Sequence, residues 1–179
     1  MDIEMLHIRK ARLEDIDALA KLYDDLNDYL AANNNYPGWK KGVYPVKEDV
    51  LHFYESDTLY VAEVNEAFAG AIALTHEPEK EPENGQWLLQ ADYSEIFVIH
   101  ILAVHPSYIR QGVAAALLQF AEETARKQVI KSIRLDVYHN NLAAINLYEK
   151  NGYQLIDKVD LGLAEYGLDL FCLYEKAVY

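Results

Sequence analysis

Residues 101–114 read Ile-Leu-Ala-Val-His-Pro-Ser-Tyr-Ile-Arg-Gln-Gly-Val-Ala and join two strongly patterned segments. The preceding run, Ser94–Val104, is rich in β-branched and apolar residues and predicts a strand. The following run, Gly112–Lys127, places small and apolar residues at helical spacing and predicts a helix. Ile133–Val137 predicts another strand, so residues 94–137 form a strand–helix–strand unit with two parallel strands.

The amino-terminal half predicts an amphipathic helix and antiparallel strands. Leu13–Leu30 carries apolar residues at three- and four-residue steps, which indicates one buried helical face. Asn65-Glu66-Ala67 lies between two β-branched runs and indicates a hairpin. The other elements expected here are a strand over 6–9, a short helix over Lys47–Tyr54, and the hairpin strands Thr58–Val64 and Phe68–Thr75.

The remaining segments extend the same pattern to the carboxyl end. Residues 76–92 carry several Glu-Pro steps and predict a mobile, polar surface loop. Asn141 is expected to cap a helix that runs to Asn151 and is stopped by Gly152. Two final strands are expected over Tyr153–Val159 and Leu168–Tyr174. With no linker or repeat in the sequence, we expect a single α/β (α+β) domain over residues 1–179, with a mixed sheet and helices on both faces.

Composition restricts the classes of partner. The 179 residues carry a formal net charge of −13, which disfavours nucleic acid and anionic membranes and favours cationic small molecules or basic peptides. No apolar run is long enough to cross a membrane, and Cys172 is the only cysteine, so we expect a cytoplasmic protein without disulfides. An exposed final strand at Leu168–Tyr174 would allow pairing across a homodimer.

The turn after Val104 has the chemistry of a phosphate site. Gly112 lets backbone approach a ligand, and small Ala114 keeps the first helical turn open. The first amides of a helix lack intrahelical partners and carry the positive end of the dipole, so they can bind a pyrophosphate in an acidic protein. A plain tight connection would also use one glycine, and on this turn alone the two interpretations are equally supported.

Two stretches of the sequence, residues 102–114 and residues 141–153, resemble motifs of the GCN5-related N-acetyltransferase (GNAT) superfamily, in particular of its small single-domain bacterial members. Leu102-Ala103-Val104-His105-Pro106 followed by Gln111-Gly112-Val113-Ala114 is similar to its acetyl-CoA motif, Gln/Arg-x-x-Gly-x-Gly/Ala. The first position of that pattern falls on Ile109, and the basic residue is displaced to Arg110. Residues 141–153, Asn-Leu-Ala-Ala-Ile-Asn-Leu-Tyr-Glu-Lys-Asn-Gly-Tyr, resemble the second motif, Asn-x-x-Ala-x-x-Leu-Tyr-Glu-Lys-x-Gly-Phe.

The resemblance implies a fold, a cofactor and its contacts. The fold would be a mostly antiparallel six- to seven-stranded sheet whose central parallel strands splay apart around the pantetheine of acetyl-CoA. Because Ile109 departs from the pattern, backbone groups would carry most of the phosphate contacts. The implied cofactor-binding residues are Leu102, Ala103, Val104, Ile109, Arg110, Gln111, Gly112, Val113, Ala114, Asn141, Ala144 and Tyr148.

The resemblance also implies direct attack of an amine on the thioester, with three candidate catalytic residues. Tyr148 matches the family tyrosine that protonates the departing thiolate, although a core aromatic would have the same spacing. His100 resembles a catalytic histidine of arylalkylamine acetyltransferases and is one candidate base; in a regular strand it shares a face with Leu102. Glu95 is the rival, expected on the opposite face unless a bulge intervenes.

The acceptor is left open by the sequence. Tyr36, Trp39 and Tyr44 can form an aromatic pocket for an amine, or simply anchor their loop. The six histidines show no metal-ligand spacing, so no metal site is expected. We therefore predict an acetyl-CoA-dependent N-acetyltransferase for a primary amine of a small molecule. The alternatives are acetylation of a protein or peptide N-terminus, and a non-catalytic acyl-CoA-binding sensor.

Overall fold

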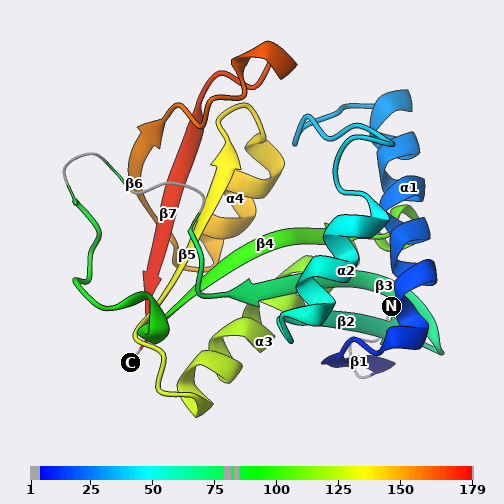
Figure 1. Ribbon diagram of the computed structural model, residues 1–179, viewed down its shortest axis with the longest axis horizontal. Helices are drawn as coiled ribbons and strands as arrows, with labels where there is room; N and C mark the ends of the chain where they lie inside the picture. Colours follow the sequence, from blue (N-terminus) through cyan, green and yellow to red (C-terminus); the bar gives the residue numbers. More distant parts are fainter. Residues whose placement is uncertain (1–4, 79–81, 83–84, 179) are drawn as a thin grey trace. The chain divides into compact units, whose positions relative to one another are not determined.

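The computed structural model describes residues 5–78, 82 and 85–178 of the chain (Figure 1). Within these residues it contains seven strands and four α-helices. The strands are β1 (Leu6–Lys10), β2 (Leu59–Val64), β3 (Ala67–Thr75), β4 (Ile96–Val104), β5 (Ser132–Tyr138), β6 (Gln154–Val159) and β7 (Phe171–Ala177). The helices are α1 (Ile16–Ala32), α2 (Lys47–Glu55), α3 (Val113–Lys127) and α4 (Leu142–Lys150).

The strands follow the order β1-β2-β3-β4-β5-β7-β6 in a seven-stranded sheet. The pairings β1–β2, β2–β3, β5–β7 and β7–β6 are antiparallel, and β4 and β5 pair in parallel. The parallel ladder joins Ile96–Val98 to Ser132–Arg134, and both strands continue beyond it. This arrangement confirms the predicted mixed, mostly antiparallel sheet with one parallel pair.

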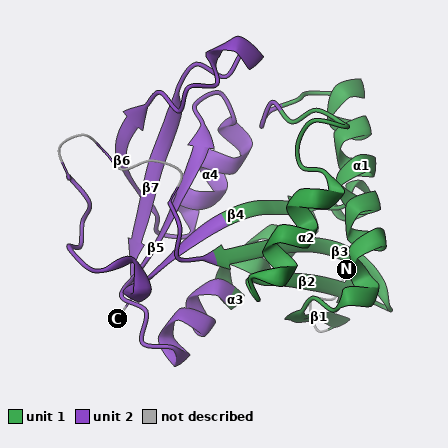
Figure 2. Ribbon diagram, in the orientation of Figure 1, with its two compact units in different colours: residues 1–35, 39–74, 100–120 green, residues 36–38, 75–99, 121–179 purple. Residues whose placement is uncertain are grey.

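The chain forms two compact units that are interleaved in sequence (Figure 2). Unit 1 contains residues 1–35, 39–74 and 100–120, and unit 2 contains residues 36–38, 75–99 and 121–179. Strand β4 and helix α3 each contribute residues to both units.

Unit 1 is layered, with helices on both faces of its strands (Figure 1). The apolar face of α1, predicted from its spacing, packs on β2 and β3: Leu19, Val61 and Ala71 are fully buried in one cluster. The opposite face contacts α3, where the ring of Tyr60 lies 5.0 Å from that of Phe120. The strands β2 and β3 form the expected hairpin, whose two turn residues both have positive φ, as a tight hairpin turn requires.

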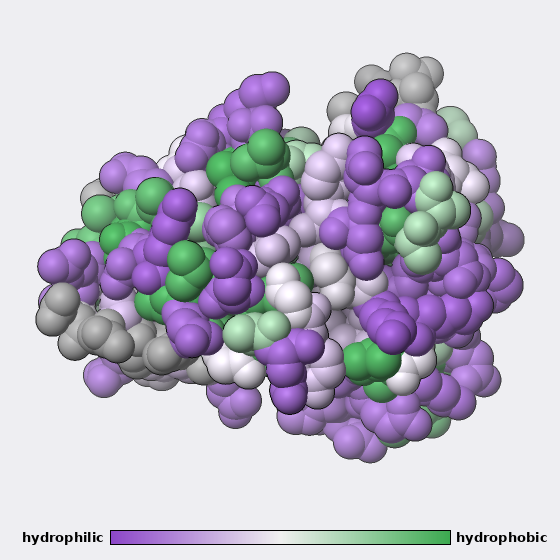
Figure 3. Space-filling model, turned by 90° about the horizontal axis from the view of Figure 1, so that it is seen from above, coloured by the Kyte–Doolittle hydropathy of each residue, from purple (hydrophilic) through white to green (hydrophobic). Residues whose placement is uncertain are grey.

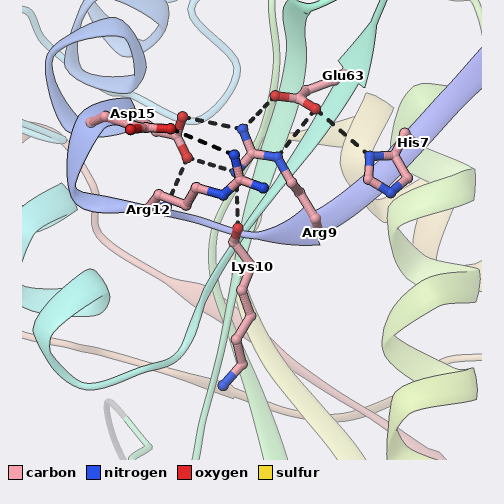
Figure 4. Close-up of polar contacts among 7 residues, drawn as sticks. His7, Arg9, Lys10, Arg12, Asp15 and Glu63 are labelled. Atoms are coloured by element: carbon pink, nitrogen blue, oxygen red, sulfur yellow. Dashed lines mark hydrogen bonds and ion pairs between the residues drawn. The ribbon is translucent and has the colours of Figure 1, made fainter.

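A charged network fixes the start of α1 to the first two strands (Figure 4). Arg9 donates to Asp15 on the turn before α1 and to Glu63 on β2. Asp15 also accepts from the backbone of Arg12, and its side chain is buried. Hydrogen bonds from Arg9 and Arg12 lower the pKa of Asp15, in opposition to burial, which would raise it. The carboxylate therefore stays charged and holds the helix start in place.

In unit 2, a buried ion pair holds the loop that precedes β4. Arg134 on β5 donates to Glu175 on β7 at 3.1 Å, and both side chains are almost completely buried. The ring of Trp87 lies 4.1 Å from the Arg134 guanidinium, and the Leu89 carbonyl accepts from it at 2.7 Å. The prediction of a polar surface loop over 76–92 is therefore only partly correct. No helix or strand occurs in its described part, but Trp87 and its neighbours are anchored by Arg134; residues 79–81 and 83–84 lie outside the description.

The carboxyl-terminal strand corrects a prediction made from the sequence. It spans Phe171–Ala177, three residues later than expected, and pairs with β5 on one side and β6 on the other. The strand therefore has no free edge, and the route to a homodimer suggested for Leu168–Tyr174 is wrong. An alternating apolar pattern identifies a strand but does not indicate whether it lies at an edge or inside a sheet.

On the face shown in Figure 3, hydrophilic residues cover most of the surface, and hydrophobic residues form separate patches. None of the helices in the described part of the chain is long and apolar enough to cross a membrane.

Candidate active site

The last half of β4 contains a left-handed residue that changes how its backbone is presented. Ile101 has a φ of +45°, which is unusual for a β-branched residue inside a strand. We call this feature the Ile101 kink. The hydroxyl of Tyr23 on α1 donates to the Ile101 carbonyl at 2.6 Å. The carbonyl is thus turned toward the helix layer.

Beyond the kink, alternate residues face opposite edges of the strand. The His105 amide donates to the Ala69 carbonyl of β3 at 2.8 Å, and the Ala103 carbonyl lies against Gly70 of the same strand. Because backbone groups alternate along a strand, those of Leu102 and Val104 point away from β3. Their positions also lie outside the β4–β5 ladder, which covers Ile96–Val98 of β4. These are the backbone groups predicted to pair with pantetheine.

The segment Pro106–Ala114, which we call the cofactor turn, leads into α3. It starts with a short 3₁₀ turn and passes through left-handed residues at Arg110 (φ +62°) and Gly112 (φ +85°). The Gln111 side chain donates to the Ser107 carbonyl at 2.9 Å and closes the turn. Ala116 donates to the Gly112 carbonyl, so the amides of residues 113–115 precede the first bond of this kind in α3. Such amides suit a pyrophosphate.

In unit 2, Asn141 caps α4 as predicted. Its side-chain oxygen accepts from the Ala144 amide at 3.2 Å. The side-chain nitrogen of Asn141 takes no part in this bond and can donate to a cofactor.

Tyr148 lies on α4 and is buried, with 7% of its surface exposed. Its ring packs against those of Tyr153 and Tyr174, as the core-aromatic interpretation also requires. Burial raises the pKa of the Tyr148 phenol, and the nearby Asp136 carboxylate raises it further. The hydroxyl therefore keeps its proton at neutral pH, which a general acid requires.

The two candidate bases have different surroundings. His100 belongs to unit 1 and stacks on Phe53 of α2, with ring centroids 5.6 Å apart and planes inclined by 26°. Glu95 belongs to unit 2 and lies in a 3₁₀ turn before β4, where it pairs with Lys131 at 2.7 Å. The Ile101 kink also separates His100 from Leu102, so the rule that alternate residues share a face does not apply between them.

The three aromatic residues predicted for the acceptor fall into both units. Trp39 and Tyr44 belong to unit 1, where Trp39 contacts Tyr23 and Tyr44, each at a centroid distance of 6.1 Å. Tyr36 belongs to unit 2. The side-chain nitrogen of Asn27 on α1 donates to the Tyr44 carbonyl at 3.2 Å and helps anchor the loop.

Sequence analysis missed two contacts from α1 to the cofactor segment. Tyr23 falls within the amphipathic helix predicted over Leu13–Leu30, and no contact with the strand was predicted for it or for Asp25. The structure joins Tyr23 to Ile101, and Asp25 to His105 at 3.4 Å. Neither pairing has a sequence signal, because each joins residues about 80 positions apart.

Within the described residues, no group of three or more His, Cys, Asp or Glu side chains is arranged to hold a metal ion.

The fold and the two motifs define a class of acyltransferases. Comparison of the sequence with known protein families identifies the particular family. The profile of the acetyltransferase (GNAT) family matches residues 19–153, well over half of the chain. The chain therefore belongs to the GNAT acetyltransferase family, which confirms the resemblance inferred from the two motifs.

Several relatives are similar in sequence. YhfO of Bacillus subtilis, an N-acetyltransferase, is 25% identical over 92% of this chain and 98% of its own length. The streptothricin acetyltransferase of Escherichia coli is 30% identical over 64% of this chain, and the N-acetyltransferase MJ1207 of Methanocaldococcus jannaschii is 27% identical over 73%. This chain spans only 59% and 57% of the lengths of these two proteins, respectively.

Solved structures show the same fold. A GNAT acetyltransferase from Streptococcus agalactiae superimposes with a TM-score of 0.79 at 22% identity, over 97% of this chain and 96% of that one. The acetyltransferase yncA from Salmonella typhimurium, solved with acetyl-CoA, superimposes with a TM-score of 0.67 at 17% identity, over 98% of this chain and 95% of that one.

Proposed function

We propose that this protein transfers the acetyl group of acetyl-CoA to a primary amine of a small molecule. The observation that carries the proposal is the presentation of backbone groups along one segment of unit 1. The outward-facing groups of Leu102 and Val104 are followed by the amides that begin α3. The strand groups fit the amides of pantetheine, and the helix amides fit a pyrophosphate.

Residues of this chain would perform four tasks in the reaction. The backbone of Leu102 and Val104 would orient the thioester, and the amides of residues 113–115 would hold the phosphates. A base, His100 or Glu95, would take a proton from the acceptor ammonium to give an uncharged amine. A carbon–nitrogen bond then forms as the carbon–sulfur bond breaks, and Tyr148 would give its phenolic proton to the departing sulfur. The proton that the nitrogen loses as it becomes an amide would return to Tyr148 through solvent and restore the phenol.

The class of acceptor is supported by charge and by one relative. A net charge of −13 attracts cations, which suits an amine that arrives as an ammonium. The relative named for acetylation of streptothricin, rather than of a protein, supports a small-molecule acceptor. The aromatic side chains of Tyr36, Trp39 and Tyr44 are the residues proposed to contact it. The cytoplasmic location and a homodimer stay predictions.

The test is release of free thiol from acetyl-CoA in the presence of primary amines or of peptides with basic N-terminal residues. We expect turnover with at least one small amine and much slower turnover with peptides. Faster turnover with peptides would replace the small-molecule acceptor with a protein N-terminus. Calorimetric binding of CoA without turnover on any acceptor would favour a sensor and contradict the proposal.

A further inference from the structure

The Ile101 kink requires a physical cause. A β-branched residue avoids positive φ because its side chain collides with its own backbone. Such a residue persists only where the surroundings fix it, and such positions concentrate where a ligand must be positioned. Ile101 is 4% exposed, so its carbonyl needs a partner from the protein.

Tyr23 supplies that partner. Its side chain is completely buried on α1, and its hydroxyl donates to the Ile101 carbonyl at 2.6 Å. Burial raises the pKa of Tyr23 well above its usual value, so the phenol remains a donor at any physiological pH. In a buried site this bond strongly favours the kinked conformation, because the alternative leaves a donor and an acceptor unpaired.

The kink sets which backbone groups face outward in the next three residues. With the kink in place, Ala103 and His105 face β3, and Leu102 and Val104 face away from it. Along a strand, the backbone groups of successive residues point to opposite sides. Loss of the kink would therefore change which of these residues face β3. The orientation of Leu102 and Val104 therefore depends on a bond made by Tyr23.

A second contact from α1 fixes the far end of the same segment. His105 accepts from the Ser107 amide through Nδ1 at 3.2 Å, so a neutral ring carries its proton on Nε2. Nε2 faces Asp25 at 3.4 Å. The contact between His105 and Asp25 lies next to the start of the cofactor turn, whereas the bond between Tyr23 and Ile101 precedes Leu102 and Val104. The two contacts should therefore affect different parts of a bound cofactor.

We propose that Tyr23 is a positioning residue for the acyl arm of acetyl-CoA: its hydroxyl holds the Ile101 kink and thereby aims the backbone of Leu102 and Val104 at pantetheine. The inference rests on the proposed function. It assigns to Tyr23 an effect on one end of the cofactor only, which a general role in core packing would not produce.

The test compares two ligands on two variants that each lose one tyrosine hydroxyl from unit 1. Tyr23→Phe keeps the ring in the core and removes the hydrogen bond. Tyr60→Phe is the matched control, since Tyr60 is also buried in unit 1 and its hydroxyl has no hydrogen-bond partner within the described residues. The ligands are acetyl-CoA and adenosine 3′,5′-bisphosphate, which keeps the adenosine, the 3′-phosphate and one 5′-phosphate but lacks the outer phosphate and pantetheine. Their Kd values are measured by calorimetry.

We expect Tyr23→Phe to weaken acetyl-CoA binding about tenfold, which is about 1.4 kcal/mol, and to change bisphosphate binding less than about twofold. Asp25→Asn should weaken both ligands to a similar degree, and Tyr60→Phe neither. Equal weakening of both ligands by Tyr23→Phe, or no change in either, would overturn the inference alone. A wild-type protein that binds acetyl-CoA no more tightly than the bisphosphate would overturn the proposed function and the inference together.

Discussion

The cofactor turn and the helix that carries Tyr148 differ in which atoms would act on a ligand. In the turn, the acting groups would be backbone amides, and side chains such as that of Arg110 lie at the surface. On α4, the acting group would be one phenol, buried between Tyr153 and Tyr174. A backbone site tolerates changes of side chain as long as its dihedral angles persist. A side-chain site depends on a single oxygen and on the packing that holds it.

The largest expected effect comes from a change in the backbone of the turn. Gly112→Val should weaken acetyl-CoA binding by at least about 100-fold, or about 2.7 kcal/mol, because φ is +85° there and a branched side chain would displace the amides. Binding is measured by calorimetry.

Gly162 provides the matched control for Gly112. It has a φ of +78°, and no atom lies within 4 Å of where its Cβ would be, so Gly162→Val has a similar backbone cost without a neighbour to displace. Cofactor binding by this variant should change less than about twofold. Equal losses in the two variants would show that destabilisation, rather than a site at Gly112, explains the result.

The next effect tests the side-chain site. Tyr148→Phe should lower kcat about 100-fold, within the range typical of a lost general acid, and leave the Kd of acetyl-CoA nearly unchanged. Tyr153→Phe is the matched control, because that hydroxyl is buried without a hydrogen-bond partner in the described part of the chain. Its kcat should stay within about twofold of wild type. A normal rate for Tyr148→Phe would remove Tyr148 from the mechanism.

The pH dependence of kcat provides an independent check on the same residue. A tyrosine with an ordinary pKa near 10 begins to lose its proton below pH 10. Burial raises the pKa of Tyr148, so its hydroxyl keeps its proton up to about pH 10. We therefore expect no fall in kcat caused by Tyr148 over that range. A fall centred below pH 10 that disappears in Tyr148→Phe would contradict the buried environment.

A smaller effect should distinguish the two candidate bases. The base takes a proton from the acceptor ammonium, so His100→Ala should lower kcat/KM about tenfold or more. Glu95→Ala should keep most of that rate and disrupt only the partly exposed pair with Lys131. An unchanged kcat/KM in His100→Ala would assign the base to another residue.

The sequence predicted the cofactor turn better than the tertiary contacts that hold it in place. The strand, the turn and the helix around Gly112 follow from local spacing, and the Asn141 cap follows from residue type. The Ile101 kink could not be predicted, because its cause is a hydroxyl on α1, 78 residues earlier. The anchoring of Trp87 likewise depends on Arg134, and the polar sequence of the loop gave no indication of this contact. Local patterns specify elements, whereas strained positions depend on tertiary contacts.

The smallest expected effect concerns Arg110, the basic residue displaced by one position from the family pattern. Its side chain is exposed and makes no hydrogen bond or ion pair with any residue that the structure describes. An exposed charge contributes up to about 1 kcal/mol, so Arg110→Ala should raise the Kd of acetyl-CoA less than about fivefold.

Comparing Arg110→Ala with Arg110→Gly separates charge from backbone at this position. Both variants lose the charge, but only glycine relieves the φ of +62°. If backbone amides hold the phosphates, Arg110→Gly should bind acetyl-CoA at least as tightly as Arg110→Ala and be slightly more stable to heat. Two results together would instead assign the phosphate contact to the Arg110 side chain: a loss of acetyl-CoA affinity of more than tenfold in both variants, and weaker acetyl-CoA binding by the wild type at high salt.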